Sequence, residues 1–313
     1  MGKRLGVGDY QYEAVEDWAS IEIPGIASDV ATDSEDHVYV ATRTSTSFDN
    51  RSGAILVFDR NGKFIKEFGG DKLVSPHHIW ISPEDQIYLT DNLDHVIRQY
   101  NPAGELLQII GTPGQPGLPD KPFNQPTCAV LAPGSGDLYV SDGYRQSRCH
   151  RMSPDGELKV SWGSGDWHEY DFTIFGYDPA PGVSPGEFKL PHGITVDKND
   201  RVYVMDRENN RIQVFDENGG YLFEWSSPGP NQGFIDENDV MHSASGRTPI
   251  DRTSGGHIRL NKLDGELIGV WGERGPASWQ FTGGPHGLWI DAHGDVYVGQ
   301  VGEQNGLNKY ART

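Results

Sequence analysis

The chain has 313 residues, with 40 glycines, 20 prolines and a formal net charge of −19 at pH 7. This negative charge argues against nucleic acid and anionic membrane surfaces as partners, and no run of 18 apolar residues predicts a transmembrane helix. Glycine and proline make up roughly a fifth of the residues, which favours short strands and tight turns over long helices. The basic start MGKR is not followed by an apolar signal-peptide stretch, so we expect a cytoplasmic location.

A unit of about 40 residues recurs along the chain, which indicates a propeller or a repeat array. Six copies follow one another, at residues 25–69, 75–111, 125–163, 190–226, about 232–272 and 284–311. The fourth copy, LPHGITVDKNDRVYVMDRENNRIQVFDENGGYLFEWS, contains four β-like runs separated by Asn, Asp and Gly turns. The first copy carries an insert before GAILVF, and the fifth is irregular at its start.

The last copy ends after its third predicted strand. The N-terminal segment QYEAVEDWA has strand character and can supply the fourth. Pairing the first and last segments closes a ring and removes exposed sheet edges. The sequence therefore predicts an all-β fold, a six-bladed β-propeller of four-stranded blades forming one domain over residues 1–313. Two separate β domains are the alternative, but no linker supports them.

Three copies begin with Pro-His directly before the first strand, in SPHHIWI, LPHGITV and GPHGLWI. The histidines are His77, His192 and His286, on the second, fourth and sixth blades. Alternate blades of a six-membered ring are ~120° apart, so three imidazoles would converge on the axis. Three imidazole ligands with one open position are typical of a catalytic zinc site, although other metals accept such ligands. The competing interpretation is a plain Pro-His-Gly turn, but the first and third blades have Ala27-Ser28 and Thr127-Cys128 instead.

The ends of the second strands should lie on the same face of the disc as these histidines. Arg43, Tyr144 and Arg207 occur there, in VYVATR, LYVSDGY and VYVMDR. Two arginines and a tyrosine beside a metal suit an anionic substrate and a proton transfer. For each arginine the alternative is a salt bridge within its blade. The remaining histidines considered, His78, His150, His168, His242 and His257, are interpreted as surface or packing residues.

The segment PHGITVDKNDRVYVMDRENNRIQVFDENG resembles the NHL repeat. Together with SPHH, YVSDGYRQSR and GPHG, it resembles the lyase domain of the peptide-amidating enzyme, peptidyl-α-hydroxyglycine α-amidating lyase. The resemblance implies a six-bladed propeller in which His77, His192 and His286 hold zinc. It further implies that Tyr144 is the general base and that Arg43 and Arg207 line the active site. The substrate would be small and anionic, or peptide-like.

The chain departs from this family at two places. The family has a calcium-binding aspartate after the third histidine, where this chain has Gly287, so a calcium ion is in question. The two cysteines of a family disulfide correspond to Gln125 and Arg145, so that disulfide is absent. Cys128 and Cys149 are the chain's own two cysteines, too few for a disulfide framework.

The resemblance implies cleavage of the N–C bond of an α-hydroxyglycine into an amide and glyoxylate. Zinc would lower the pKa of the substrate hydroxyl, and Tyr144 would accept its proton. Two alternatives stay open, a metal-dependent hydrolase of the lactonase or amidase type and a non-catalytic NHL binding scaffold. A long insertion, residues 164–188, is a candidate substrate lid, and a second excursion near 246–256 can border the same pocket.

Overall fold

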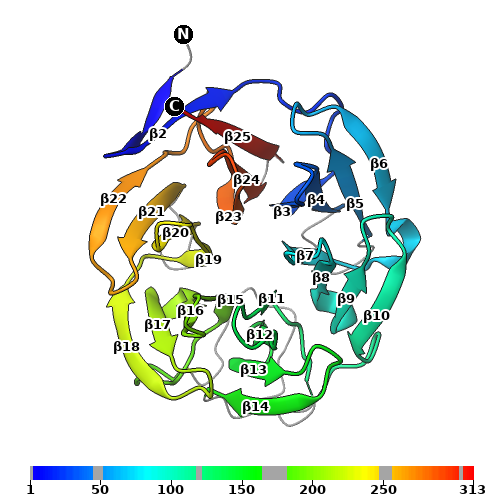
Figure 1. Cartoon of the computed structure of the whole chain (residues 1–313), viewed down its shortest axis with the longest axis vertical. Helices are drawn as coiled ribbons and strands as arrows, with labels where there is room; N and C mark the ends of the chain where they lie inside the picture. The colour runs from blue at the N-terminus through cyan, green and yellow to red at the C-terminus, as the bar shows by residue number, and fades with distance from the viewer. Residues whose placement is uncertain (1–2, 45–51, 118–121, 164–181, 247–255, 303–305) are drawn as a thin grey trace.

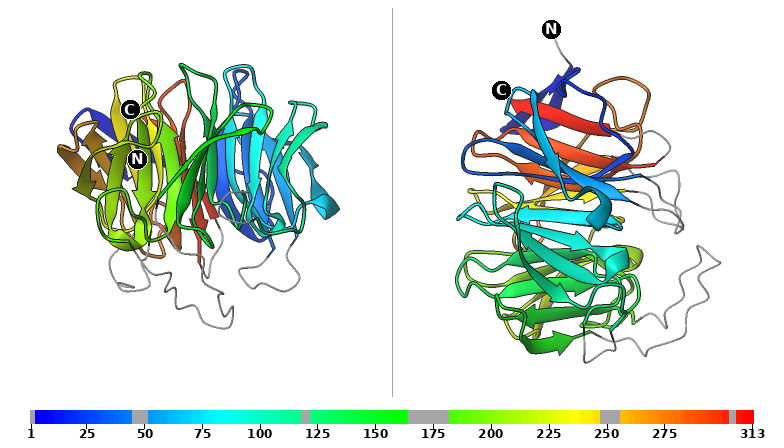
Figure 2. Two further views of the ribbon diagram at one scale, coloured as in Figure 1. Left: turned by 90° about the horizontal axis from the view of Figure 1, so that it is seen from below. Right: turned by 90° about the vertical axis from the view of Figure 1, so that its right-hand side faces the viewer.

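The computed structural model describes residues 3–44, 52–117, 122–163, 182–246, 256–302 and 306–313. Over these ranges the strands form six antiparallel sheets, which surround a central channel as the blades of a propeller (Figure 1). In the edge-on views the strands of each blade run between the two faces of a disc (Figure 2). The predicted six-bladed β-propeller is confirmed.

Each of the first five blades is built from four consecutive strands, which follow one another from the channel outward. Blade 1 contains β3 (Ile26–Thr32), β4 (Val38–Arg43), β5 (Gly53–Phe58) and β6 (Phe64–Phe68). Blade 2 contains β7 (Pro76–Ile81), β8 (Ile87–Asp91), β9 (Val96–Tyr100) and β10 (Leu106–Gly111). Blade 3 contains β11 (Cys128–Leu131), β12 (Leu138–Asp142), β13 (Arg148–Met152) and β14 (Leu158–Trp162). Blade 4 contains β15 (Pro191–Val196), β16 (Val202–Asp206), β17 (Arg211–Phe215) and β18 (Tyr221–Ser226). Blade 5 contains β19 (Pro230–Ile235), β20 (Val240–Ser245), β21 (His257–Lys262) and β22 (Leu267–Trp271).

Blade 6 joins the two ends of the chain. Its inner strands are β23 (Gly284–Ile290), β24 (Val296–Val301) and β25 (Gly306–Arg312). The N-terminal strand β2 (Tyr10–Val15) pairs antiparallel with β25, so the predicted closure is confirmed. A fifth strand, β1 (Arg4–Val7), pairs with β2 and was not predicted, because four residues are too few to show a strand pattern.

A repeated contact between aspartate and tyrosine explains why the copies resemble one another. An aspartate follows the innermost strand, and its carboxylate accepts backbone N–H bonds within the turn that leads to the second strand. The same carboxylate accepts a bond from a tyrosine hydroxyl on the second strand, at 3.0 Å for Tyr39 and Asp33, 3.1 Å for Tyr203 and Asp197, and 3.3 Å for Tyr297 and Asp291. Each of these three blades is thereby pinned at its innermost hairpin.

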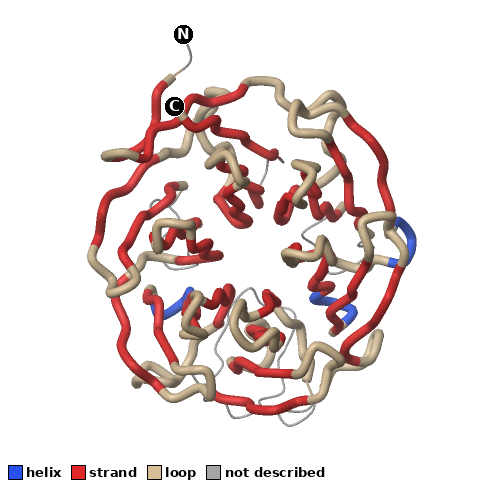
Figure 3. The backbone as a smooth tube through the Cα atoms, in the orientation of Figure 1, coloured by secondary structure: helices blue, strands red, loops and turns tan. Residues whose placement is uncertain are grey.

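Helical structure in the described residues is limited to three 3₁₀ turns (blue in Figure 3). These turns are η1 (Gly70–Lys72), η2 (Asn92–Asp94) and η3 (Arg207–Asn209). None of these helices has the length or the apolar character needed to cross a membrane.

Ring closure should depend on Tyr12 of β2. Its side chain is 1% exposed and packs against Trp271 of the neighbouring blade, with ring centroids 5.0 Å apart. We expect Tyr12→Ala to lower the free energy of unfolding by about 3–5 kcal/mol. Tyr12→Phe, which loses only a 3.3 Å hydrogen bond from Arg312, should cost no more than about 1.5 kcal/mol.

Denaturant titrations of both variants measure these costs, with Tyr221→Ala as the control because Tyr221 is 37% exposed. A Tyr12→Ala variant as stable as the Tyr221→Ala control would show that β2 does not hold the ring closed.

Candidate metal centre

The three predicted histidines meet in the channel. His77 and His192 are the second residues of the innermost strands β7 and β15, and His286 is the third residue of β23. One nitrogen from each ring lies within 4.8 Å of the other two, and the ring centroids are 4.7–4.9 Å apart. The side chains are nearly inaccessible to solvent, because the three residues are only 1%, 2% and 7% exposed. Blades 2, 4 and 6 thus converge on one point.

Each histidine is oriented by the next blade around the ring. The Nδ1 atoms of His77, His192 and His286 lie 2.7, 2.9 and 2.8 Å from the backbone carbonyl oxygens of Thr127, Asn231 and Ser28. A carbonyl can only accept, so each Nδ1 carries a proton and donates it. The lone pair of each imidazole is therefore on Nε2, which is the atom that can bind a metal.

The same three acceptor residues also donate through their side chains. Ser28 and Thr127 hydroxyls and the Asn231 amide bond the carbonyls of the prolines that precede the histidines, namely Pro76, Pro191 and Pro285, at 2.9, 2.9 and 2.7 Å. These bonds and the histidine bonds close a ring of six hydrogen bonds around the channel, which we call the channel ring. Sequence reasoning missed it. It treated Ser28 and Thr127 only as positions without histidine, and did not consider Asn231.

Burial keeps the three imidazoles neutral. It lowers the pKa of His77 and His192 well below the ordinary 6.5, with the other histidines and the nearby arginines adding to the effect. Burial, with Arg43 adding to it, lowers the pKa of His286 to about 3. Neutral imidazole is the form that binds metals. The Nε2 atom of His286 is buried without a hydrogen-bond partner among the described residues, and a metal ion would satisfy it. These residues therefore fit a metal ion.

Tyr144 reaches the metal centre from blade 3. It follows β12 by two residues, at the predicted end of a second strand. Its hydroxyl lies 2.9 Å from Nε2 of His77 and 3.2 Å from Nε2 of His192. The phenol oxygen is therefore held beside the two nitrogen atoms that would face a metal.

Arg43 and Arg207 supply positive charge near the metal centre. Both lower the pKa of His286, which places their charges near the centre. Arg43 is buried, and burial lowers the pKa of its guanidinium while nearby Tyr144 acts in the opposite direction. Arg207 forms a salt bridge with Glu208 at 2.9 Å, so the predicted alternative of a salt bridge within the blade is present for this arginine, whereas Asp206 pairs with Arg211.

The carboxylate that the family resemblance implies at position 287 comes from a different blade. A Cβ atom on Gly287 would lie 2.1 Å from Oδ1 of Asp29, so Asp29 fills this space. The buried Asp29 carboxylate accepts the Ile79 N–H at 2.9 Å and lies 3.4 and 3.5 Å from nitrogens of Gln232 and His78. These neighbours are nitrogen groups, whereas Ca²⁺ takes six to eight oxygen ligands. Oδ1 of Asp29 has no hydrogen-bond partner among the described residues, but the nitrogen groups around Oδ2 do not supply the further oxygen ligands that calcium needs.

The other histidines mostly pack within blades. His150 and His242 are buried, in agreement with the packing interpretation, and His257 is half-buried. His78 is also buried, but it lies in the channel beside Asp29. His168 lies outside the described residues, as do residues 164–181 of the predicted lid and 247–255 of the second excursion.

Cys128 and Cys149 are free and buried. Burial raises the pKa of both thiols, so neither is a reactive thiolate.

Comparison with known proteins gives matches in sequence and in fold. Residues 188–215 match the family model of the NHL repeat. Peptidylglycine alpha-amidating monooxygenase of Rattus norvegicus is 32% identical over 231 residues, which cover 66% of this chain and 22% of that protein. Peptidyl-alpha-hydroxyglycine alpha-amidating lyase 1 of Drosophila melanogaster is 32% identical over 187 residues, covering 54% of this chain and 33% of that protein. NHL repeat-containing protein 3 of Mus musculus is 29% identical over 292 residues, covering 87% and 75%.

Among solved structures, a streptogramin B lyase has a TM-score of 0.60 at 13% identity and covers 99% of this chain and 98% of its own. At that identity the likeness shows the fold alone. The chain is thus an NHL-repeat β-propeller with a three-histidine centre in its channel. Its sequence is similar to the amidating enzymes of rat and fly over 66% and 54% of its length. Its match spans only 22% of the rat relative.

The channel ring should set the affinity for metal. Ser28→Ala removes the hydroxyl that donates to Pro76 but keeps the carbonyl that accepts from His286. We expect the zinc dissociation constant to rise by about tenfold, since residues that orient metal ligands typically contribute 10–100-fold. Ser227→Ala is a matched control, because Ser227 is equally buried and its hydroxyl bonds none of the described residues. Chelator competition measures both constants, and equal values for the two variants would contradict this role.

Calcium should not stabilise this protein. A Ca²⁺ ion bound with a dissociation constant of about 10 µM would, at about 1 mM, add about 2.7 kcal/mol and raise the Tm of a chain this long by ~4 °C. After chelation we expect calcium to change the Tm by less than about 1 °C, and zinc to raise it. A calcium-dependent rise would show that Asp29 is a calcium ligand.

Proposed function

We propose that this protein is a zinc-dependent lyase that cleaves the N–C bond of an N-acyl-α-hydroxyglycine, or of a related small carbinolamide, into an amide and glyoxylate. The observation that carries this proposal is the placement of the Tyr144 hydroxyl, 2.9 and 3.2 Å from the Nε2 atoms of His77 and His192. A potential proton acceptor and a set of neutral metal ligands thereby share one point of the channel. The name of the fly relative supports the same chemistry.

His77, His192 and His286 would hold the zinc through Nε2. When bound, zinc supplies a Lewis acid that acidifies a hydroxyl group beside it. The chain's own residues hold these ligands in place, because the channel ring fixes each imidazole ring and its protonation state.

Tyr144 would move the proton. As a phenolate, Tyr144 would accept the proton of the substrate hydroxyl on its oxygen, the C–O bond becomes a carbonyl, and the electron pair of the N–C bond leaves with the amide nitrogen. That nitrogen takes up the proton, so the products are a primary amide and glyoxylate, and no water is consumed. Tyr144 returns to its initial state.

Arg43 and Arg207 would bind the substrate carboxylate. Guanidinium groups pair with carboxylates through charge-assisted hydrogen bonds, and burial of Arg43 strengthens such a pair by excluding water. A small anionic or peptide-like substrate is therefore favoured.

Turnover of N-benzoyl-α-hydroxyglycine tests the proposal. We expect zinc-dependent release of benzamide and glyoxylate, and a 10²–10⁴-fold lower kcat for Tyr144→Phe, the range of general acid–base catalysis. Tyr144→Phe should keep its zinc content, whereas His192→Ala should lose it, which separates proton transfer from metal binding.

Solvent oxygen distinguishes this lyase from a hydrolase that uses the same metal. In ¹⁸O-water a lyase releases unlabelled benzamide, while hydrolysis of the acyl bond releases benzoate that carries the label. Labelled benzoate would overturn the lyase assignment. A chain that is purified without zinc and does not take it up would instead be a binding scaffold.

A further inference from the structure

The far end of the central channel holds a pocket that the proposed function does not use. It has a volume of about 390 Å³ and is lined by residues at the ends of all six innermost strands, including Thr32, Ile81, Val196 and Ile290. The metal centre lies at the opposite ends of these strands. His77 and Ile81 are four residues apart on β7, which corresponds to ~13 Å along a strand. The pocket, which we call the distal pocket, is thus separate from the metal centre.

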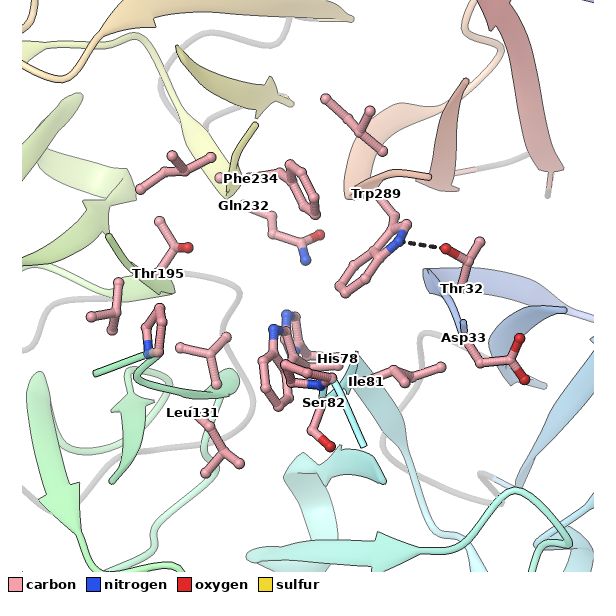
Figure 4. Close-up of a pocket in the computed structure, with 18 of the residues that line it drawn as sticks. Thr32, Asp33, His78, Ile81, Ser82, Leu131, Thr195, Gln232, Phe234 and Trp289 are labelled. Atoms are coloured by element: carbon pink, nitrogen blue, oxygen red, sulfur yellow. Dashed lines mark hydrogen bonds between the residues drawn. The ribbon is translucent and has the colours of Figure 1, made fainter. Parts of the chain in front are cut away.

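The walls of the distal pocket are largely aromatic. Trp80, Phe234 and Trp289 line it from blades 2, 5 and 6. Trp289 donates its indole N–H to Thr32 at 2.8 Å, which fixes the plane of its ring, and Phe234 packs edge-on against it at 5.1 Å. Figure 4 shows Phe234 and Trp289 beside the open centre of the six blades. These walls suit a flat apolar molecule.

Two polar side chains close the inner end of the distal pocket. His78 and Gln232 line both the pocket and the narrow space below the metal centre, and Figure 4 shows them near the channel axis. His78 is 5% exposed, and its Nδ1 atom has no hydrogen-bond partner among the described residues. The Gln232 carbonyl accepts from Leu288, but its amide nitrogen makes only a 3.4 Å contact with Asp29. Apolar walls over a few buried polar groups are typical of a small-molecule site.

The charge around the distal pocket disfavours anions. Among the described residues, those that line it include Asp33 and Asp85 and no lysine or arginine. The chain as a whole carries a net charge of −19, and indole faces attract cations. A neutral or cationic ligand is therefore favoured over an anionic one.

We propose that the distal pocket binds a small neutral or cationic molecule with a flat apolar body. The body packs against Trp80 and Trp289, and a polar group of the ligand bonds Nδ1 of His78. This site is independent of the proposed lyase chemistry, because none of its lining residues is assigned a catalytic role.

Indole, tryptamine and indole-3-acetate test this proposal, since they share one ring system and differ in charge. Titration calorimetry and ligand-observed NMR should show saturable one-to-one binding of indole and tryptamine, with indole-3-acetate at least tenfold weaker. Thr195→Trp, which fills the distal pocket, should weaken tryptamine binding at least tenfold. Thr112→Trp is the matched control, because Thr112 is exposed beyond β10, and it should change binding less than twofold.

Two further measurements, on a Trp80→Leu variant and after chelation of metal, complete the test. Trp80→Leu removes one aromatic wall without filling the pocket, and it should also weaken tryptamine at least tenfold if Thr195→Trp does not fold. Chelation of metal should leave binding within twofold, whatever the outcome of the lyase assay. No saturable binding, binding insensitive to both pocket variants, equal binding of indole-3-acetate, or loss of binding on chelation would each overturn the proposal.

Discussion

The channel ring is the constraint on which the centre of this molecule depends. Blades 2, 4 and 6 each contribute a Pro-His pair and blades 1, 3 and 5 one residue each, so histidine donors on blades 2, 4 and 6 alternate with carbonyl acceptors on blades 1, 3 and 5. Such alternation closes only when the number of blades is even, so the six-fold architecture and the three-fold metal centre belong together. A single hydrogen bond contributes only about 1 kcal/mol. Six in a closed circuit fix the three imidazoles relative to one another without a metal ion.

Closure of the chain and completion of the metal centre are therefore one event. His286 on the last blade donates to Ser28 on the first, and 258 positions separate them in the sequence. This bond forms only when blade 6 has met blade 1, which β2 secures from outside by pairing with β25. The third ligand is thus oriented by the same contact that closes the propeller. A substitution that displaces the outer strands of blade 6 would therefore also displace His286 and alter the metal centre.

The fold and the histidines were predictable because each leaves a local pattern. The blades share alternating strand patterns and Asp turns, and three of them share a Pro-His pair. The position of this pair in the repeat places His77, His192 and His286 around one axis. The channel ring was not predictable, because its acceptors are backbone carbonyls, which any residue provides. Its three donors other than the histidines differ in type, since they are Ser28, Thr127 and Asn231. Side-chain identity alone carries no signal for such a network.

The exchange between Asp29 and Gly287 shows the same limit over a longer distance. The family resemblance implies an aspartate where this chain has Gly287, so the sequence alone indicates that a buried carboxylate is missing. In the structure Asp29 of β3 places a carboxylate in the same space. A carboxylate held by N–H groups, as Asp29 is by Ile79, replaces the attraction of a cation with hydrogen bonds. The middle of the channel is then closed by protein groups. The two ends differ in charge, with Arg43 and Arg207 around the metal centre and Asp33 and Asp85 around the distal pocket. One channel can thereby favour an anion at one end and exclude it from the other.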